Sequence, residues 1–129
     1  NHRKGLFDAY LIKENHIQSC GGITEAIKTA RKLNPHLTLE IEVKNTDELD
    51  EALTTVPDII MLDNFSLFEL KKAVEINKGR VKLEASGGIG KDSVVEIAET
   101  GVDYISIGNL TKNCKAIDLS LLITNDEFL

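Results

Sequence analysis

Short apolar runs alternate along the chain with stretches that are apolar on one side only. In residues 24–33, apolar side chains recur at three- and four-residue spacing, the period of a one-sided helix, and Asn34-Pro35 ends the pattern. Ile59–Leu62, in contrast, is apolar at every position, which is typical of a parallel strand covered on both faces. The pattern therefore predicts repeated strand–helix units.

The predicted strands are Phe7–Ile12, Leu37–Val43, Ile59–Leu62, Val81–Ala85 and Tyr104–Ile107. The predicted helices are 24–33, Asp47–Thr54, 66–76 (opened by a capping box at Ser66 and Glu69) and Lys91–Thr100, and a last apolar run is Ile117–Ile123. Units of roughly 20–25 residues joined by short loops predict parallel strands connected by right-handed crossovers.

Both an open doubly wound sheet and a closed α/β barrel fit this order. The run Leu39–Val43 distinguishes them, because Glu40 and Glu42 point to one side of the strand and the apolar residues to the other. Two carboxylates facing a helix layer would be costly, whereas at the mouth of a barrel they can be solvated or bound to a ligand. We therefore predict an α/β class fold with a parallel (β/α) barrel.

Composition narrows the class of protein further. The chain has 129 residues, 42% of them hydrophobic, which suits one domain, and no apolar stretch is long enough to span a membrane. A net charge of -6 with 5% aromatic residues and no Trp argues against a nucleic-acid partner. Cys20 and Cys114 lack metal-ligand spacing and fit a reducing, cytoplasmic location. Because its most polar segment lies at the first residues, we expect the chain to be part of a longer protein.

Residues capable of chemistry follow the predicted strands, and functional groups of α/β barrels lie at the carboxyl ends of the strands. Lys13 follows the first strand, and the opening segment adds His2 and Arg3. Arg presents a fork of donors that matches a carboxylate or phosphate, and Lys adds a point charge. These three residues predict a pocket for a small acidic substrate. His16 is interpreted as a capping or packing residue.

Glycines follow the fourth and fifth strands. In Ser86-Gly87-Gly88, the backbone N–H groups can approach an anion closely, and Gly108 can add donors from the next strand end. The alternative reading is a pair of tight strand-to-helix turns. Taken together, the two glycine sites favour phosphate binding.

Glu42 and Asp63 are carboxylates on neighbouring strand ends. Such a pair can hold Mg²⁺ through water, accept hydrogen bonds from sugar hydroxyls, or stabilise an oxocarbenium-like transition state. The alternative is a solvated pair of acids. Glu40 faces the same way but lies deeper, so a structural partnership with a buried cation is at least as good an interpretation.

The residues together resemble a known family. Asn1-His2-Arg3-x-Gly5-Leu6, Leu11-Ile12-Lys13, Glu40-Ile41-Glu42-Val43, Met61-Leu62-Asp63-Asn64, Glu84-Ala85-Ser86-Gly87-Gly88 and Asp118-Leu119-Ser120-Leu121 are similar, in this order, to the signature of quinolinate phosphoribosyltransferases. The resemblance implies that residues 1–129 form an irregular barrel of about six strands, with 117–129 returning towards an amino-terminal sandwich domain that this chain lacks.

The resemblance also implies the reaction and its site. Quinolinate and phosphoribosyl pyrophosphate, which carries Mg²⁺, would give nicotinate mononucleotide, pyrophosphate and CO₂ in a homodimer or higher homo-oligomer. His2, Arg3 and Lys13 would bind quinolinate, and Glu42 and Asp63 would be catalytic. Ser86, Gly87, Gly88 and Gly108 would line the phosphate site, with Asn64 close by as a further substrate-binding residue. No metal ligand is expected from the protein. The alternatives are another phosphate-binding barrel and a non-catalytic binding domain.

Overall fold

The computed structural model describes residues 10–90, 92–107 and 110–113. The strands are β1 (Tyr10–Ile12), β2 (Leu39–Val43), β3 (Ile59–Asp63), β4 (Lys82–Ser86), β5 (Tyr104–Ile107) and β6 (Leu110–Asn113). The helices are α1 (Glu14–Cys20), α2 (Ile23–Leu33), α3 (Thr46–Thr55), α4 (Leu67–Asn77) and α5 (Val94–Glu99). The predicted segment 117–129 lies outside the described residues.

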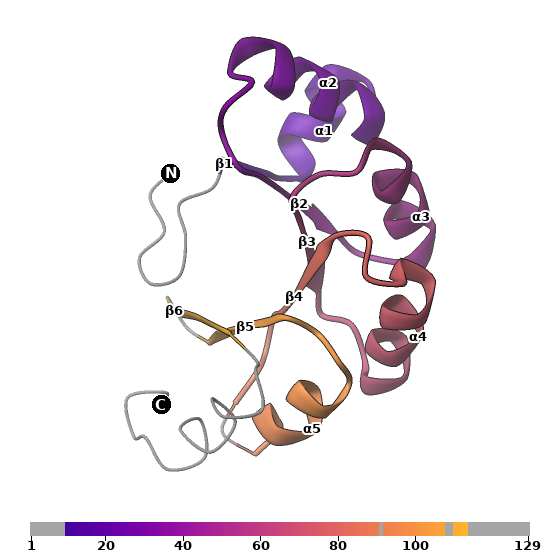
Figure 1. Ribbon diagram of the computed structural model, residues 1–129, viewed down its shortest axis with the longest axis vertical. Coiled ribbons are helices and arrows are strands. Elements are labelled where there is room, and N and C mark those ends of the chain that lie inside the picture. Colours follow the sequence, from indigo (N-terminus) through magenta and orange to yellow (C-terminus); the bar gives the residue numbers. More distant parts are fainter. Residues whose placement is uncertain (1–9, 91, 108–109, 114–129) are drawn as a thin grey trace.

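The strands form one sheet in chain order, β1-β2-β3-β4-β5-β6, parallel from β1 to β5 and antiparallel between β5 and β6. Helices α1–α5 lie along one side of the curved sheet (Figure 1). A doubly wound sheet would carry helices on both faces and reverse its strand order at a switch point. Sequential strands with helices on one side instead form the wall of an α/β barrel, so the predicted fold class is confirmed.

The apolar core lies between the sheet and the helices. Ile41, Ile60 and Leu83 occupy equivalent positions on three neighbouring strands and are at most 1% exposed. Because successive side chains of a strand point to opposite faces, their neighbours along each strand must face the other side of the sheet. Because Ile41, Ile60 and Leu83 face the helices, the residues next to them along each strand line the inner face of the barrel wall.

Acidic residues lie on that inner face. Glu40 and Glu84 are fully buried on the strands to either side of β3, where Glu40 pairs with Ile59 and Glu84 with Met61. Each takes part in at least one hydrogen-bonding, ionic or electrostatic interaction. The predicted alternation within β2 is confirmed, and Glu40 lies deeper than the partly buried Glu42. The cation partner of Glu40 stays a prediction.

The helix ends carry the expected caps. In α4, the Ser66 N–H donates to Glu69 Oε1 (2.9 Å), and the Glu69 N–H donates to Ser66 Oγ (3.2 Å). This reciprocal pair satisfies two N–H groups that have no partner inside the helix, and it confirms the predicted capping box. No helix among the described residues is long and apolar enough to cross a membrane.

Three elements differ from the prediction. Helix α1 was not predicted, because none of its residues is buried and it therefore has no apolar period. Strand β6 was also not predicted; it returns antiparallel to β5. Helix α5 begins at Val94 rather than Lys91, since Asp92 and Ser93 form a turn and Lys91 lies outside the described residues.

Candidate functional site

The carboxyl ends of strands β1–β4 meet at one edge of the sheet. Asp63, the last residue of β3, pairs in register with Ser86, the last residue of β4. Glu42 lies near the end of β2, beside Met61, and Lys13 directly follows β1. All four side chains are at least partly exposed at this edge. The sequence thus places a cation, two carboxylates and a glycine-rich loop on adjacent strand ends.

Glu42 and Asp63 act as a pair. Burial raises the pKa of Glu42 above its ordinary value, and the charge of Asp63 and a hydrogen bond between the two side chains raise that pKa further. Lys13 and Lys44 lower the pKa of Glu42, because their positive charges favour its ionised form. Two carboxylates held this closely repel each other when both are ionised, so the pair favours a ligand that brings positive charge.

Lys44 is a site residue that the sequence analysis missed. It directly follows β2, and its Nζ forms an ion pair with Glu14 at the start of α1. The hydrogen bond and the charge of Glu14 raise the pKa of Lys44, and Glu42 and Asp63 add to this effect. Its backbone N–H donates to Glu48 Oε1 (2.7 Å). No motif indicated Lys44; the only available signal was its position directly after a strand.

A small cavity lies beside Glu42. It measures about 110 Å³ and is lined by Glu14, Ile17, Gln18, Glu42, Lys44 and Glu48. Helices α1 and α3 supply its walls and β2 its base. An ion pair that joins α1 to the end of β2 therefore forms part of the surroundings of Glu42.

The segment Ser86–Gly88 has the backbone of an anion-binding loop. Gly87 and Gly88 have φ values of +92° and +61°, a left-handed region that favours glycine. Within the described part of the chain, the N–H groups of these two glycines donate no hydrogen bond. Consecutive N–H groups of this kind can converge on an anion. The loop also lines a mostly apolar cavity of about 210 Å³, together with Phe65 and Ile89.

Asn64 connects β3 to this loop. Its φ of +58° is left-handed, a conformation that Asn tolerates better than most residues. Its N–H donates to the Ser86 carbonyl (2.9 Å), which extends the pairing of β3 and β4 by one residue. The Asn64 side chain lies against Gly87. Asn64 therefore lies beside the glycine loop, and its role in substrate binding stays a prediction.

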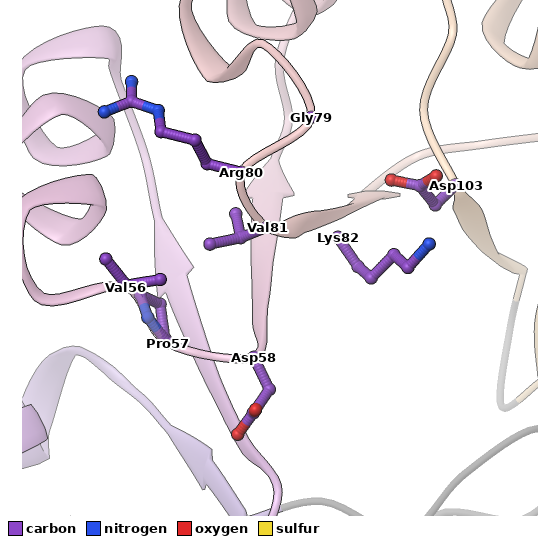
Figure 2. A pocket seen from close by; sticks show the side chains of 8 residues that line it. All are labelled: Val56, Pro57, Asp58, Gly79, Arg80, Val81, Lys82 and Asp103. Atoms are coloured by element: carbon purple, nitrogen blue, oxygen red, sulfur yellow. The ribbon is translucent and has the colours of Figure 1, made fainter.

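Another cavity lies at the opposite end of the strands (Figure 2). It measures about 310 Å³ and is lined by Val56, Pro57, Asp58, Gly79, Arg80, Val81, Lys82 and Asp103. Asp58 Oδ2 accepts the Leu39 N–H (2.7 Å), and Asp103 Oδ2 accepts the Leu83 N–H (3.0 Å). Asp58, just before β3, therefore binds the start of β2, and Asp103, just before β5, binds the start of β4.

Arg80, one of the cations that line this cavity, caps a helix instead of binding a ligand there. In Figure 2, the Arg80 side chain points away from Lys82 and Asp103. Its guanidinium donates to the carbonyls of Asn77 (3.0 Å) and Ile76 (2.9 Å) and so caps the end of α4. The polar groups here serve the fold, and the candidate site is at the carboxyl ends.

The structure brings together seven of the ten predicted site residues. Lys13, Glu42, Asp63, Asn64, Ser86, Gly87 and Gly88 lie at the same edge of the sheet. His2, Arg3 and Gly108 lie outside the described residues. His16 is a capping residue, as interpreted, because its Nδ1 accepts the Lys13 N–H (3.3 Å). Among the residues that the structure describes, no three His, Cys, Asp or Glu side chains form a group that could hold a metal ion.

Comparison with known proteins identifies the family. The family model described as quinolinate phosphoribosyl transferase, C-terminal domain, matches residues 1–122. The probable nicotinate-nucleotide pyrophosphorylase (carboxylating) of Bacillus subtilis is 41% identical over 125 residues, which cover 96% of this chain and 43% of that protein.

Solved structures agree with this result. The nicotinate-nucleotide pyrophosphorylase from Francisella tularensis is 56% identical with a TM-score of 0.77, covering 89% of this chain and 41% of that one. The enzyme of the same name from Ehrlichia chaffeensis is 47% identical with a TM-score of 0.76, covering 86% and 42%. This chain thus spans less than half the length of these relatives. It belongs to the family of quinolinate phosphoribosyl transferase C-terminal domains.

Proposed function

We propose that this chain forms the barrel domain of an enzyme that transfers the phosphoribosyl group of phosphoribosyl pyrophosphate to quinolinate and releases CO₂. The observation that carries the proposal is the hydrogen-bonded pair Glu42 and Asp63 beside the Ser86–Gly88 loop. This arrangement suits a substrate that combines a phosphate with a sugar whose reacting carbon becomes positive. Family membership suggests quinolinate as the acceptor.

The carboxylate pair would act mainly on the transition state. As the bond from the anomeric carbon to pyrophosphate breaks, that carbon and the ring oxygen gain positive charge. Glu42 and Asp63 repel each other in the absence of that charge, so their attraction to the sugar is stronger in the transition state than in the ground state. Their oxygens would also accept hydrogen bonds from the ribose hydroxyls.

The remaining site residues would position two anionic substrates. Ser86, Gly87 and Gly88, together with Gly108, would donate to the phosphate of the sugar, and Asn64 lies beside them. Lys13, with His2 and Arg3, would bind the two carboxylates of quinolinate. Holding both substrates in contact lowers the barrier by removing the cost of bringing them together.

The chemistry proceeds in two steps. The lone pair of the pyridine nitrogen forms a bond to the anomeric carbon, and pyrophosphate leaves with the electron pair of the broken C–O bond. The positive ring nitrogen then accepts electron density as the bond to the adjacent carboxylate breaks; CO₂ leaves, and the ring carbon takes a proton. Mg²⁺ would enter with phosphoribosyl pyrophosphate and neutralise the leaving group.

The test is an assay that follows pyrophosphate and CO₂ release from the two substrates in parallel. We expect Glu42→Gln and Arg3→Ala to lower kcat/KM by about 100-fold or more, as is usual for a lost charge contact to a transition state. Glu75→Gln, which neutralises an exposed carboxylate on α4, is the matched control and should leave both rates unchanged. Full activity in the Glu42→Gln variant would exclude the proposed role of the pair.

Two other outcomes would each replace the proposal. Turnover of a different phosphorylated metabolite, with none of quinolinate, would indicate another phosphate-binding barrel. Phosphate binding with no turnover of any phosphoribosyl donor would indicate a non-catalytic binding domain.

We also propose a cytoplasmic homodimer or higher homo-oligomer. The free thiol of Cys20 suits a reducing compartment. Light scattering on the purified protein measures the assembly directly, and a monomer at micromolar concentration would exclude a stable dimer.

A further inference from the structure

Asn64 and Gly87 are in closer contact than any side chain at Gly87 would permit. A Cβ atom added to Gly87 would lie 2.6 Å from Asn64 Oδ1, 2.9 Å from Asn64 Cγ and 3.0 Å from the Asn64 backbone nitrogen. Contacts below 3.0 Å require something to move. Gly87 is therefore a glycine for two reasons: its left-handed backbone, and the space that Asn64 occupies.

We propose that Asn64 is a positioning residue: it packs against Gly87, holds the Ser86–Gly88 loop in its anion-binding conformation, and thereby sets the affinity for the phosphate group without touching it. The inference rests on the proposed function and assigns Asn64 a different role from a direct phosphate ligand.

The reason lies in the flexibility of glycine. Two consecutive glycines have many accessible conformations, and ordering them when a ligand binds reduces its affinity. Asn64 restricts the loop from two directions. Its N–H holds the Ser86 carbonyl at 2.9 Å, and its side chain blocks the space on one side of Gly87. The N–H groups of the two glycines are thereby oriented before the phosphate arrives.

The residue type suits this role. A left-handed backbone restricts position 64 to Gly, Asn and Asp with little strain. Gly would lack the side chain that contacts Gly87. Asp has the same shape but would place a negative charge beside the bound anion. Asn combines the required backbone conformation with a neutral side chain of the right length.

The first test compares Asn64→Gly with the unmodified protein. We expect the KM for phosphoribosyl pyrophosphate to rise roughly tenfold, because the loop must then be ordered by the ligand. The KM for quinolinate and kcat should change by less than about threefold, since these depend on groups that keep their positions. A general loss of structure would instead raise both KM values and lower the melting temperature.

Lys78→Gly is the matched control. Lys78 is also a left-handed, exposed residue at the end of an element, with a φ of +52°, but it lies at the end of α4, away from the strand carboxyl ends. It should leave both KM values unchanged. A KM for phosphoribosyl pyrophosphate that stays unchanged in Asn64→Gly would overturn the inference, as would an equal rise in both KM values.

A double-mutant cycle with Gly87→Ala tests the contact itself. In the unmodified protein, the new Cβ meets Asn64 Oδ1 and Cγ. In the Asn64→Gly background these two side-chain atoms are gone, and only the backbone strain at Gly87 and the contact with the backbone nitrogen of residue 64 remain. Gly87→Ala should therefore raise the KM for phosphoribosyl pyrophosphate in both backgrounds, but by a smaller factor in Asn64→Gly. We expect the factor in the unmodified protein to exceed that in Asn64→Gly by about threefold or more. Fully additive effects would overturn the inference.

Inorganic phosphate separates this inference from the proposed reaction. Its dissociation constant, measured by calorimetry without any turnover, should rise roughly tenfold in Asn64→Gly. If the protein binds phosphate in this way but never turns over quinolinate, the reaction is wrong and the positioning role stands. If the unmodified protein binds no phosphate, or binds it equally well without Asn64, the positioning role is wrong.

Discussion

Asn77 allows a stability prediction whose size follows from the structure. It is the last residue of α4, and its side chain is 3% exposed. Asn77 Oδ1 accepts the N–H of Val81 (3.0 Å), and Asn77 Nδ2 donates to the carbonyl of Val81 (2.8 Å). One side chain thus satisfies both backbone groups of the buried residue that precedes β4, the strand that ends at Ser86.

Asn77→Ala removes both partners at once. A buried polar group left without a partner costs about 1–3 kcal/mol, so two such groups should lower the free energy of unfolding by about 2–6 kcal/mol. Asn77→Asp keeps the acceptor for the Val81 N–H but loses the donor to its carbonyl at neutral pH. Because the introduced carboxyl group regains a donor when it is protonated, this variant should become more stable relative to the unmodified protein as the pH falls.

Urea denaturation followed by circular dichroism measures these differences. Asn34→Ala is the matched control, because Asn34 is an exposed residue that also follows a helix, and it should lose less than about 0.5 kcal/mol. A loss below about 1 kcal/mol in Asn77→Ala, or one equal to the control, would refute the assignment of two buried hydrogen bonds to this side chain.

Three further predictions concern charge and strain. Val56 has a left-handed φ of +48°, and Val56→Asn should stabilise the protein by about 0.5–1 kcal/mol in the same urea assay, because a β-branched residue is strained there; a loss of stability would contradict this. Since the pKa of Glu42 is raised on folding, its ionisation opposes folding above its ordinary pKa. Glu42→Gln should therefore be more stable than the unmodified protein at neutral pH but not near pH 4. An equal difference in stability at both pH values would contradict the raised pKa. Lys44→Met removes a charge that lowers the pKa of Glu42, so the acidic limb of the kcat/KM profile should move to higher pH, and an unmoved limb would exclude the effect of Lys44.

The strand-end residues could be predicted because two sequence patterns, the alternation in β2 and the continuous apolar run of β3, each show where a strand ends. The alternation in β2 places Glu42 on the inner face, and the fully apolar β3 ends at Asp63, where the polar sequence resumes. Parallel strands bring their carboxyl ends to one edge, so the pairing of Asp63 with Ser86 follows from the fold class. The sequence pattern cannot supply the strength of the interaction between Glu42 and Asp63, because burial and hydrogen bonding depend on the packed structure.

Helix α1 shows why Lys44 escaped prediction. α1 has no fully buried residue, and only Ile17 and Cys20 among its described residues are partly buried against the core. Its ends are capped: the Lys13 N–H donates to His16 Nδ1, and Gly21 ends the helix with a left-handed φ of +92°. This helix brings Glu14 to Lys44, and the resulting ion pair holds the cation near Glu42. Because an exposed ion pair contributes little to stability, Lys44 affects the site mainly through the charge it places beside Glu42, so a reading based on core periodicity would miss it.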